Sequence, residues 1–189
     1  AQATMVLTRV LNPLPFGIVI TDEDGRINRF MEKPTWSEVF SDTINTGIYI
    51  LEPGILDLIP VDKEFDFSKD LFPLLLEKKI ALYGYIAEGY WKDVGSLEEY
   101  RQANLDILQG KVKVTIPGVE VDKRGVWLGK DSKADYTCKL EGSVVIGMNC
   151  NIGGNVRINN SVIGDNITIE EGATVISSVL WNNISIGKR

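Results

Sequence analysis

From Val126 onward an aliphatic residue recurs every six positions, and many of these residues are followed by glycine. The spacing slips to five at two places and then resumes; the positions are Leu128, Ala134, Leu140, Ile146, Ile152, Ile158, Ile163, Ile169, Val175, Leu180 and Ile186. Six-residue spacing is typical of a parallel β-helix, in which the aliphatic side chain fills a triangular coil and small residues fit its corners. With this many matches to the six-residue spacing, a chance pattern in an ordinary β-sandwich is improbable. We therefore expect residues 126–189 to form an all-β helix of this kind.

The preceding residues, 1–110, mix short apolar runs with helical patterns, which is typical of an α/β region. Strands are expected over 4–10, 17–22, 26–31, 47–51, 80–86 and 90–94, and helices over 53–59, 70–78 and 97–108. A turn at residues 23–25 joins the second and third strands into a hairpin. Ser96 and Glu99 form a capping box that starts the last helix. Residues 111–125 are expected to be a connector.

Composition removes several classes of function. There is no histidine, so imidazole bases and histidine metal sites are excluded. Cys138 and Cys150 are too few for a four-ligand zinc site and are expected to be reduced. A net charge of −6 argues against nucleic acid as a partner. No apolar run approaches the ~20 residues that span a bilayer, so no membrane partner and a cytoplasmic location are expected.

Four short strings stand in a fixed order before the β-helix. They are Phe16-Gly17, Phe30-Met31-Glu32-Lys33-Pro34, Asn45-Thr46-Gly47-Ile48-Tyr49 and Tyr90-Trp91-Lys92-Asp93-Val94-Gly95. With the β-helix, they resemble the sugar-phosphate half of the sugar-nucleotide pyrophosphorylases, nucleotidyltransferases that carry a left-handed β-helix. Residues 40–47 and 66–73 make the chain most similar to bacterial mannose-1-phosphate guanylyltransferases. The Gly-rich loop of the nucleotide-binding half is not in this sequence. We therefore expect a fragment that is inactive alone.

The resemblance implies an α/β, Rossmann-like sugar-binding half followed by a left-handed parallel β-helix of hexapeptide repeats. It also assigns roles in substrate binding. Glu32 accepts hydrogen bonds from sugar hydroxyls, and Lys33 pairs with the sugar-1-phosphate as a catalytic residue. Asn45 binds a sugar hydroxyl, while Gly17 and Gly47 let the backbone approach the sugar. Taken singly, these residues also fit a solvated pair before a turn, a turn that starts a strand and a glycine at a strand start.

Asp93 is the remaining catalytic residue that the resemblance implies, as a ligand of Mg²⁺. Its position between Trp91 and a tight turn suggests a carboxylate that is at least half-buried. The other interpretation is an aspartate at a helix entry, bonded to backbone N–H groups. The implied reaction is attack by the sugar-1-phosphate oxygen on the α-phosphorus of a nucleoside triphosphate, with release of pyrophosphate. Sugar-1-phosphate and nucleoside triphosphate are thus the expected partners.

Two other functions stay open. One is a non-catalytic regulatory homologue, although the presence of Glu32, Lys33, Asn45 and Asp93 favours the enzyme. The other is a β-helix assembly module, which explains residues 126–189 only. Acyltransferases share the β-helix but generally use a catalytic histidine. We expect homo-oligomers through the β-helix. No residue fixes the base, and mannose rests on the resemblance alone.

Overall fold

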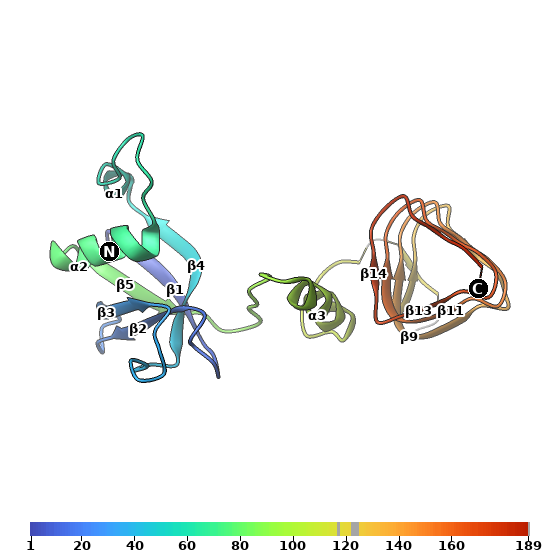
Figure 1. Ribbon diagram of the computed structural model, residues 1–189, viewed down its shortest axis with the longest axis horizontal. Helices are drawn as coiled ribbons and strands as arrows, with labels where there is room; N and C mark the ends of the chain where they lie inside the picture. The colour runs from blue at the N-terminus through green and yellow to red at the C-terminus, as the bar shows by residue number, and fades with distance from the viewer. Residues whose placement is uncertain (117, 122–124, 189) are drawn as a thin grey trace. The chain divides into compact units, whose positions relative to one another are not determined.

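The computed structural model describes residues 1–116, 118–121 and 125–188, and the chain divides into two compact units, Ala1–Trp91 and Lys92–Arg189. The first unit is a mixed α/β layer, and the second ends in a β-helix (Figure 1). The predicted order of α/β region and β-helix is thus confirmed. The domain limit at residue 110 stays a prediction. Within the predicted connector, 117 and 122–124 lie outside the described residues.

A five-stranded sheet forms the first unit. In the order β3-β2-β4-β1-β5 it contains β1 (Ala3–Arg9), β2 (Gly17–Thr21), β3 (Ile27–Glu32), β4 (Thr43–Leu51) and β5 (Leu82–Ile86). Only β1 and β5 pair in parallel; the other neighbours are antiparallel. The predicted hairpin is β2–β3, and its turn is closed because the Asp22 carboxylate accepts hydrogen bonds from the backbone N–H of Asp24 and Arg26.

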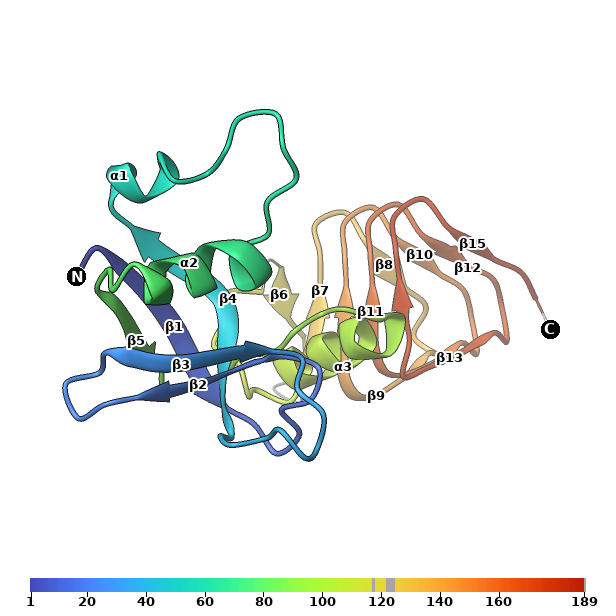
Figure 2. The ribbon, with the colours of Figure 1, turned by 60° about the vertical axis from the view of Figure 1, so that its left-hand side comes forward.

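One face of this sheet is covered by helix (Figure 2). The predicted helix at 53–59 is only the short α1 (Pro53–Leu56), and the one at 70–78 begins earlier, as a π-helical turn η1 (Phe67–Leu71) that continues into α2 (Phe72–Glu77). Because Asp66 caps η1 from its side chain, the helical conformation can start before residue 70. The core between helix and sheet contains Ala3, Met5, Leu7, Val19, Ile27, Ile55, Leu71, Phe72, Leu75 and Leu82.

The second unit opens with an irregular segment and helix α3 (Leu97–Leu108). The predicted strand at 90–94 is wrong: these residues have no strand partner among the described residues. Ser96 is the N-cap, as predicted, and its Oγ accepts the Glu99 N–H at 3.1 Å. The Glu99 carboxylate pairs with Lys92, so only half of the capping box forms. At 12 residues α3 is the longest described helix, and none of the described helices could span a membrane.

The β-helix is a stack of coils with a triangular outline (Figure 1). Its strands are β6 (Val119–Glu120), β7 (Val126–Leu128), β8 (Lys133–Ala134), β9 (Lys139–Ile146), β10 (Asn151–Ile152), β11 (Arg157–Ile163), β12 (Thr168–Ile169), β13 (Thr174–Ile176), β14 (Val179–Leu180) and β15 (Ser185–Ile186). Apart from β6, which is antiparallel to β7, they pair in parallel with the next coil. Equivalent positions are 17 or 18 residues apart, as three sides of six residues, with an occasional side of five, require.

All the aliphatic residues that the spacing picked out lie in one core or pack against it. Small residues stand at the corners, as expected. A Cβ at Gly147 would lie 2.7 Å from the Gly164 carbonyl of the next coil. Asn149, Asn166 and Asn183 stack above one another, and each amide nitrogen donates to the next amide oxygen, at 3.3 and 3.1 Å. Successive coils are thus joined both by apolar packing in the interior and by hydrogen bonds at a corner.

Both cysteines of the chain are free and belong to this core. Cys150 is buried, with its Sγ 3.1 Å from the Gly164 carbonyl oxygen. Cys138 is half-buried, with its Sγ 3.1 Å from the Gly153 carbonyl oxygen. Burial raises the pKa of the Cys138 thiol, which disfavours the reactive thiolate.

Candidate functional site

The start of β2 and the end of β3 bring Gly17 and Glu32 side by side. The two residues are partners in the antiparallel ladder. A Cβ at Gly17 would lie 2.7 Å from Glu32 Oε2 and 2.7 Å from Phe30 Cζ. Glycine therefore leaves the space that the side chains of Glu32 and Phe30 occupy. The resemblance assigned both Gly17 and Glu32 to the sugar, and the structure places the two residues next to each other.

Lys33, the next residue, ends β3 in an unusual backbone conformation. Its φ is 46°, while its N–H still donates to the Phe16 carbonyl oxygen at 3.0 Å. A side chain in the left-handed region costs roughly 1–2 kcal/mol, and such strain gathers at functional sites. The Lys33 side chain is exposed and has no ion pair among the described residues. Its charge is therefore available to an anion.

Asn45 and Gly47 lie in a β-bulge of β4, which lies next to β2. Met5 of β1 pairs with Tyr49 and Leu7 pairs with Asn45, so the single residue between them faces three residues of β4. Gly47 has a φ of 80°, a conformation that glycine adopts without strain. Its N–H donates to Asn45 Oδ1 at 2.9 Å. The bulge therefore fixes both predicted residues in one local structure.

The amide of Asn45 also contacts two residues for which the sequence predicted no role. Its Nδ2 donates to the Tyr49 hydroxyl at 2.8 Å and lies 3.5 Å from Ser68 Oγ. Burial raises the pKa of Tyr49, and the nearby carboxylates of Glu32 and Asp66 raise it further. The Tyr49 hydroxyl therefore stays protonated at neutral pH. Tyr49 and Ser68 lie within strings that carried the resemblance, but 23 residues separate Asn45 from Ser68, so spacing alone could not pair them.

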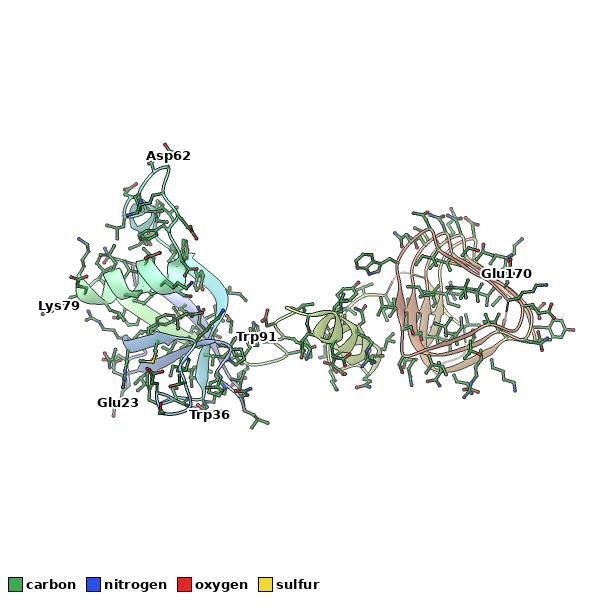
Figure 3. All side chains as sticks on the ribbon, viewed as in Figure 1. Glu23, Trp36, Asp62, Lys79, Trp91 and Glu170 are labelled. Carbon is green, nitrogen blue, oxygen red and sulfur yellow. The ribbon has the colours of Figure 1, made fainter. Side chains whose placement is uncertain are left out.

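Trp91 is the last residue of the first unit, labelled in Figure 3. Its ring packs edge-on against Phe16, with 5.5 Å between centroids and 72° between planes. Phe16 directly precedes Gly17, so this contact anchors the end of the first unit beside the start of β2.

Asp93 lies two residues further on, in the irregular segment of the second unit. Its side chain is exposed, so the expectation of a carboxylate that is at least half-buried is wrong. No hydrogen bond or ion pair to this carboxylate is found among the described residues, and the backbone N–H bonds of a helix-entry aspartate are not found either.

The described residues contain no group of three histidine, cysteine, aspartate or glutamate side chains that could hold a metal ion. A Mg²⁺ ion typically takes one or two protein carboxylates and completes its shell with phosphates and water. The exposed, unpaired Asp93 fits the role of one such ligand.

Comparison with known proteins gives matches to both units. A family model described as nucleotidyl transferase matches residues 1–110, and one described as GMPPB C-terminal domain matches residues 123–189. The chain is 38% identical to the UTP–glucose-1-phosphate uridylyltransferase of Synechocystis sp., over 99% of this chain and 49% of that protein. It is 33% identical to the mannose-1-phosphate guanylyltransferase of Mycobacterium tuberculosis, over 93% and 48% of the two chains.

A third relative is the glucose-1-phosphate adenylyltransferase of Bacillus anthracis, 35% identical over 92% of this chain and 46% of that protein. The names of the three relatives thus give three different nucleotidyl groups and two different sugars, glucose and mannose. The chain spans about half the length of the curated relatives it matches.

Proposed function

The chain belongs to the nucleotidyl transferase family, and from this we propose that it is part of a sugar-1-phosphate nucleotidyltransferase. Its share of the work is to bind the sugar-1-phosphate. The carrying observation is that an exposed, unpaired Lys33 directly follows Glu32, whose carboxylate lies over Gly17. A cation for phosphate and an acceptor for hydroxyl groups are thereby adjacent, which matches the two halves of a sugar phosphate.

In this proposal each residue has one role. Lys33 pairs with the phosphate, and Glu32 accepts hydrogen bonds from sugar hydroxyls. Asn45 accepts one more, and Gly17 and Gly47 give the sugar access to the backbone. The bulge supports this assignment, because a regular strand would pair the backbone groups that a ligand needs.

The reaction proposed for the whole protein is transfer of a nucleotidyl group. A phosphate oxygen of the sugar-1-phosphate attacks the α-phosphorus of a nucleoside triphosphate; the new P–O bond forms as the bond to pyrophosphate breaks. Lys33 holds the attacking phosphate and offsets its charge. Asp93 would be one ligand of Mg²⁺, which when bound supplies electrostatic stabilisation of the phosphates. We propose that the triphosphate site lies in the part of the relatives' length that this chain does not span.

Mannose-1-phosphate and GTP are the substrates we propose, on the strength of the Mycobacterium tuberculosis relative and the match to a GMPPB C-terminal domain. We propose that the β-helix of the second unit is built from hexapeptide repeats and that it associates with other copies of itself. We also propose a cytoplasmic location for the protein. Exposed Met148, Ile176 and Trp181 on this unit support association, since apolar groups on a surface favour contact with another protein.

The test is a titration of the ¹⁵N-labelled chain with mannose 1-phosphate, mannose and inorganic phosphate, followed by NMR. We expect the amides of Gly17, Lys33 and Gly47 to shift with a Kd on the order of millimolar. Lys33→Met should abolish the response to both phosphates, whereas Lys63→Met, an exposed lysine of the same unit, should leave it unchanged. Absence of shifts in the unmodified chain, or an unchanged response in Lys33→Met, would contradict the proposed function.

A second measurement concerns catalysis. With GTP, mannose 1-phosphate and Mg²⁺, we expect no pyrophosphate release by this chain alone, since it spans about half of its relatives. In the complete parent protein, Asp93→Asn should reduce turnover strongly and raise the Mg²⁺ concentration needed for half-maximal rate. Turnover by the homogeneous chain alone would refute the division of labour, and full activity of Asp93→Asn would refute the metal role.

A further inference from the structure

The amide of Asn45 has three of its four hydrogen-bonding positions occupied. A side-chain amide offers two N–H donors and two oxygen lone pairs. The donors face the Tyr49 hydroxyl, at 2.8 Å, and Ser68 Oγ, at 3.5 Å. One lone pair of Oδ1 accepts the Gly47 N–H at 2.9 Å. The position left over, among the described contacts, is the second lone pair of Oδ1.

The orientation of this amide is fixed chemically. The backbone N–H of Gly47 can only donate, so the oxygen of Asn45 must face it. The nitrogen must then face Tyr49 and Ser68, which therefore have to accept. A hydroxyl group can accept and still donate its own proton elsewhere, so these two residue types satisfy the amide without conflict.

Tyr49 is itself held in place by packing. Its ring packs against those of Phe72 and Phe67, at centroid distances of 4.9 and 5.7 Å. Burial together with the charges of Glu32 and Asp66 raises the pKa of the hydroxyl, so it remains a neutral hydrogen-bonding group.

Ser68 is held by a reciprocal cap on the π-helical turn. The Asp66 carboxylate accepts from the backbone N–H of Ser68 and of Lys69, both at 2.8 Å. In return, the Asp66 N–H donates to Asp70 Oδ2 at 2.8 Å. The sequence singled out residues 66–73 only for their resemblance, and the cap gives part of this string a role, because it fixes the backbone of Ser68, whose hydroxyl faces Asn45.

We propose that Tyr49 and Ser68 are positioning residues, which lock the Asn45 amide so that its oxygen presents one free lone pair to a sugar hydroxyl. This inference rests on the proposed function and deepens it. Its consequence is specificity. A site that accepts a hydrogen bond from a hydroxyl strongly rejects an analogue in which that hydroxyl is absent. The discriminating sugar position should therefore be one at which a deoxy analogue binds less well.

The experiment compares Tyr49→Phe and Ser68→Ala with a matched control, Tyr85→Phe, whose ring is exposed on β5. In ¹⁵N spectra of the chain, we expect the Asn45 side-chain amide protons to shift and to exchange faster in the first two variants only. For mannose 1-phosphate the Kd should rise between about 2- and 12-fold, the effect of one lost hydrogen bond. The Kd for inorganic phosphate, whose binding reports on Lys33, should stay unchanged. Ser68→Thr, which keeps the hydroxyl, should restore binding.

The outcomes separate this inference from the proposed function. If the unmodified chain binds mannose 1-phosphate while both variants bind it equally well with unshifted Asn45 resonances, the positioning role is refuted and the proposed function stands. If phosphate affinity falls in parallel with sugar-phosphate affinity, the variants have disturbed the fold of the site, and the specific role is refuted. If the unmodified chain binds neither ligand, the proposed function fails and the sugar-recognition role with it.

Discussion

Replacing Gly17 by alanine inserts a methyl group where the structure leaves no room. The new Cβ would lie 2.7 Å from Glu32 Oε2 and 2.7–2.8 Å from two ring atoms of Phe30. The Glu32 carboxylate is at the end of a flexible side chain and can swing away. The Phe30 ring is less free, because it packs edge-on against Phe72 at a centroid distance of 5.6 Å.

The expected magnitude follows from these contacts. Overpacking of a well-packed site costs about 1–3 kcal/mol. For a domain of the size of the first unit, each kcal/mol lowers Tm by roughly 4–8 °C. Displacement of Glu32 also removes a charged acceptor, and such hydrogen bonds contribute about 1.5–3 kcal/mol. Affinity for the sugar-phosphate should therefore fall about tenfold or more, together with stability.

The assay is urea unfolding followed by NMR cross-peaks, in which β2 and β3 report on the first unit and β9 and β11 on the β-helix. The matched control is Gly54→Ala, since a Cβ at Gly54 of α1 meets nothing within 4 Å and alanine favours helix. We expect a lower midpoint for the first unit only in Gly17→Ala, with the β-helix midpoint unchanged in both. Equal midpoints for the two variants would refute the packing argument.

Three further predictions follow from single side chains. Lys33→Gly should raise the free energy of unfolding by about 1 kcal/mol or less, because the left-handed conformation suits glycine, while phosphate binding is lost; a drop in urea stability would contradict this. Because the pKa of Tyr49 is raised, its hydroxyl stays protonated to a higher pH in the folded chain than in the unfolded chain. The resulting contribution to stability is intact below about pH 10 and falls above it. Tyr49→Phe should flatten that fall as pH rises through about 10, and equal slopes in the two proteins would exclude the effect. With iodoacetamide in the native protein, Cys138 should react slowly and the buried Cys150 more slowly still, as mass spectrometry can measure; faster modification of Cys150 would contradict its burial.

The β-helix could be predicted from the sequence because each side of a coil requires the same pattern of residues. Every side needs one apolar residue inside, so Ile146, Ile152 and Ile158, which are spaced six apart, are all buried. The β2–β3 hairpin could be predicted for a similar reason. A short turn between two strands of alternating polar and apolar residues is a local signal that does not depend on the rest of the fold. In both cases the partners are set by a fixed spacing along the chain.

Other features depend on partners that spacing does not reveal. The segment 90–94 has strand-like composition, but composition cannot provide a neighbouring strand with which to pair. Asp93 lies two positions after Trp91, and this position suggested burial, but the Asp93 side chain is exposed. The contact between Asn45 and Ser68 requires both the bulge in β4 and the cap on η1. Such features arise from tertiary structure, and sequence reasoning could name the strings involved without the contacts.

The left-handed Lys33 and the bulge at Gly47 have a common physical meaning. A regular sheet uses its backbone N–H and C=O groups within its own ladder, so a ligand can reach the backbone only where the ladder is interrupted. In the first unit, β3 ends at the strained Lys33 and β4 departs from register opposite Val6, whose carbonyl oxygen accepts the Thr46 hydroxyl at 2.8 Å. Both interruptions coincide with strings that the resemblance assigns to the sugar-phosphate. In the proposed function, ligand binding is the reason that the sheet tolerates a strained lysine and this bulge.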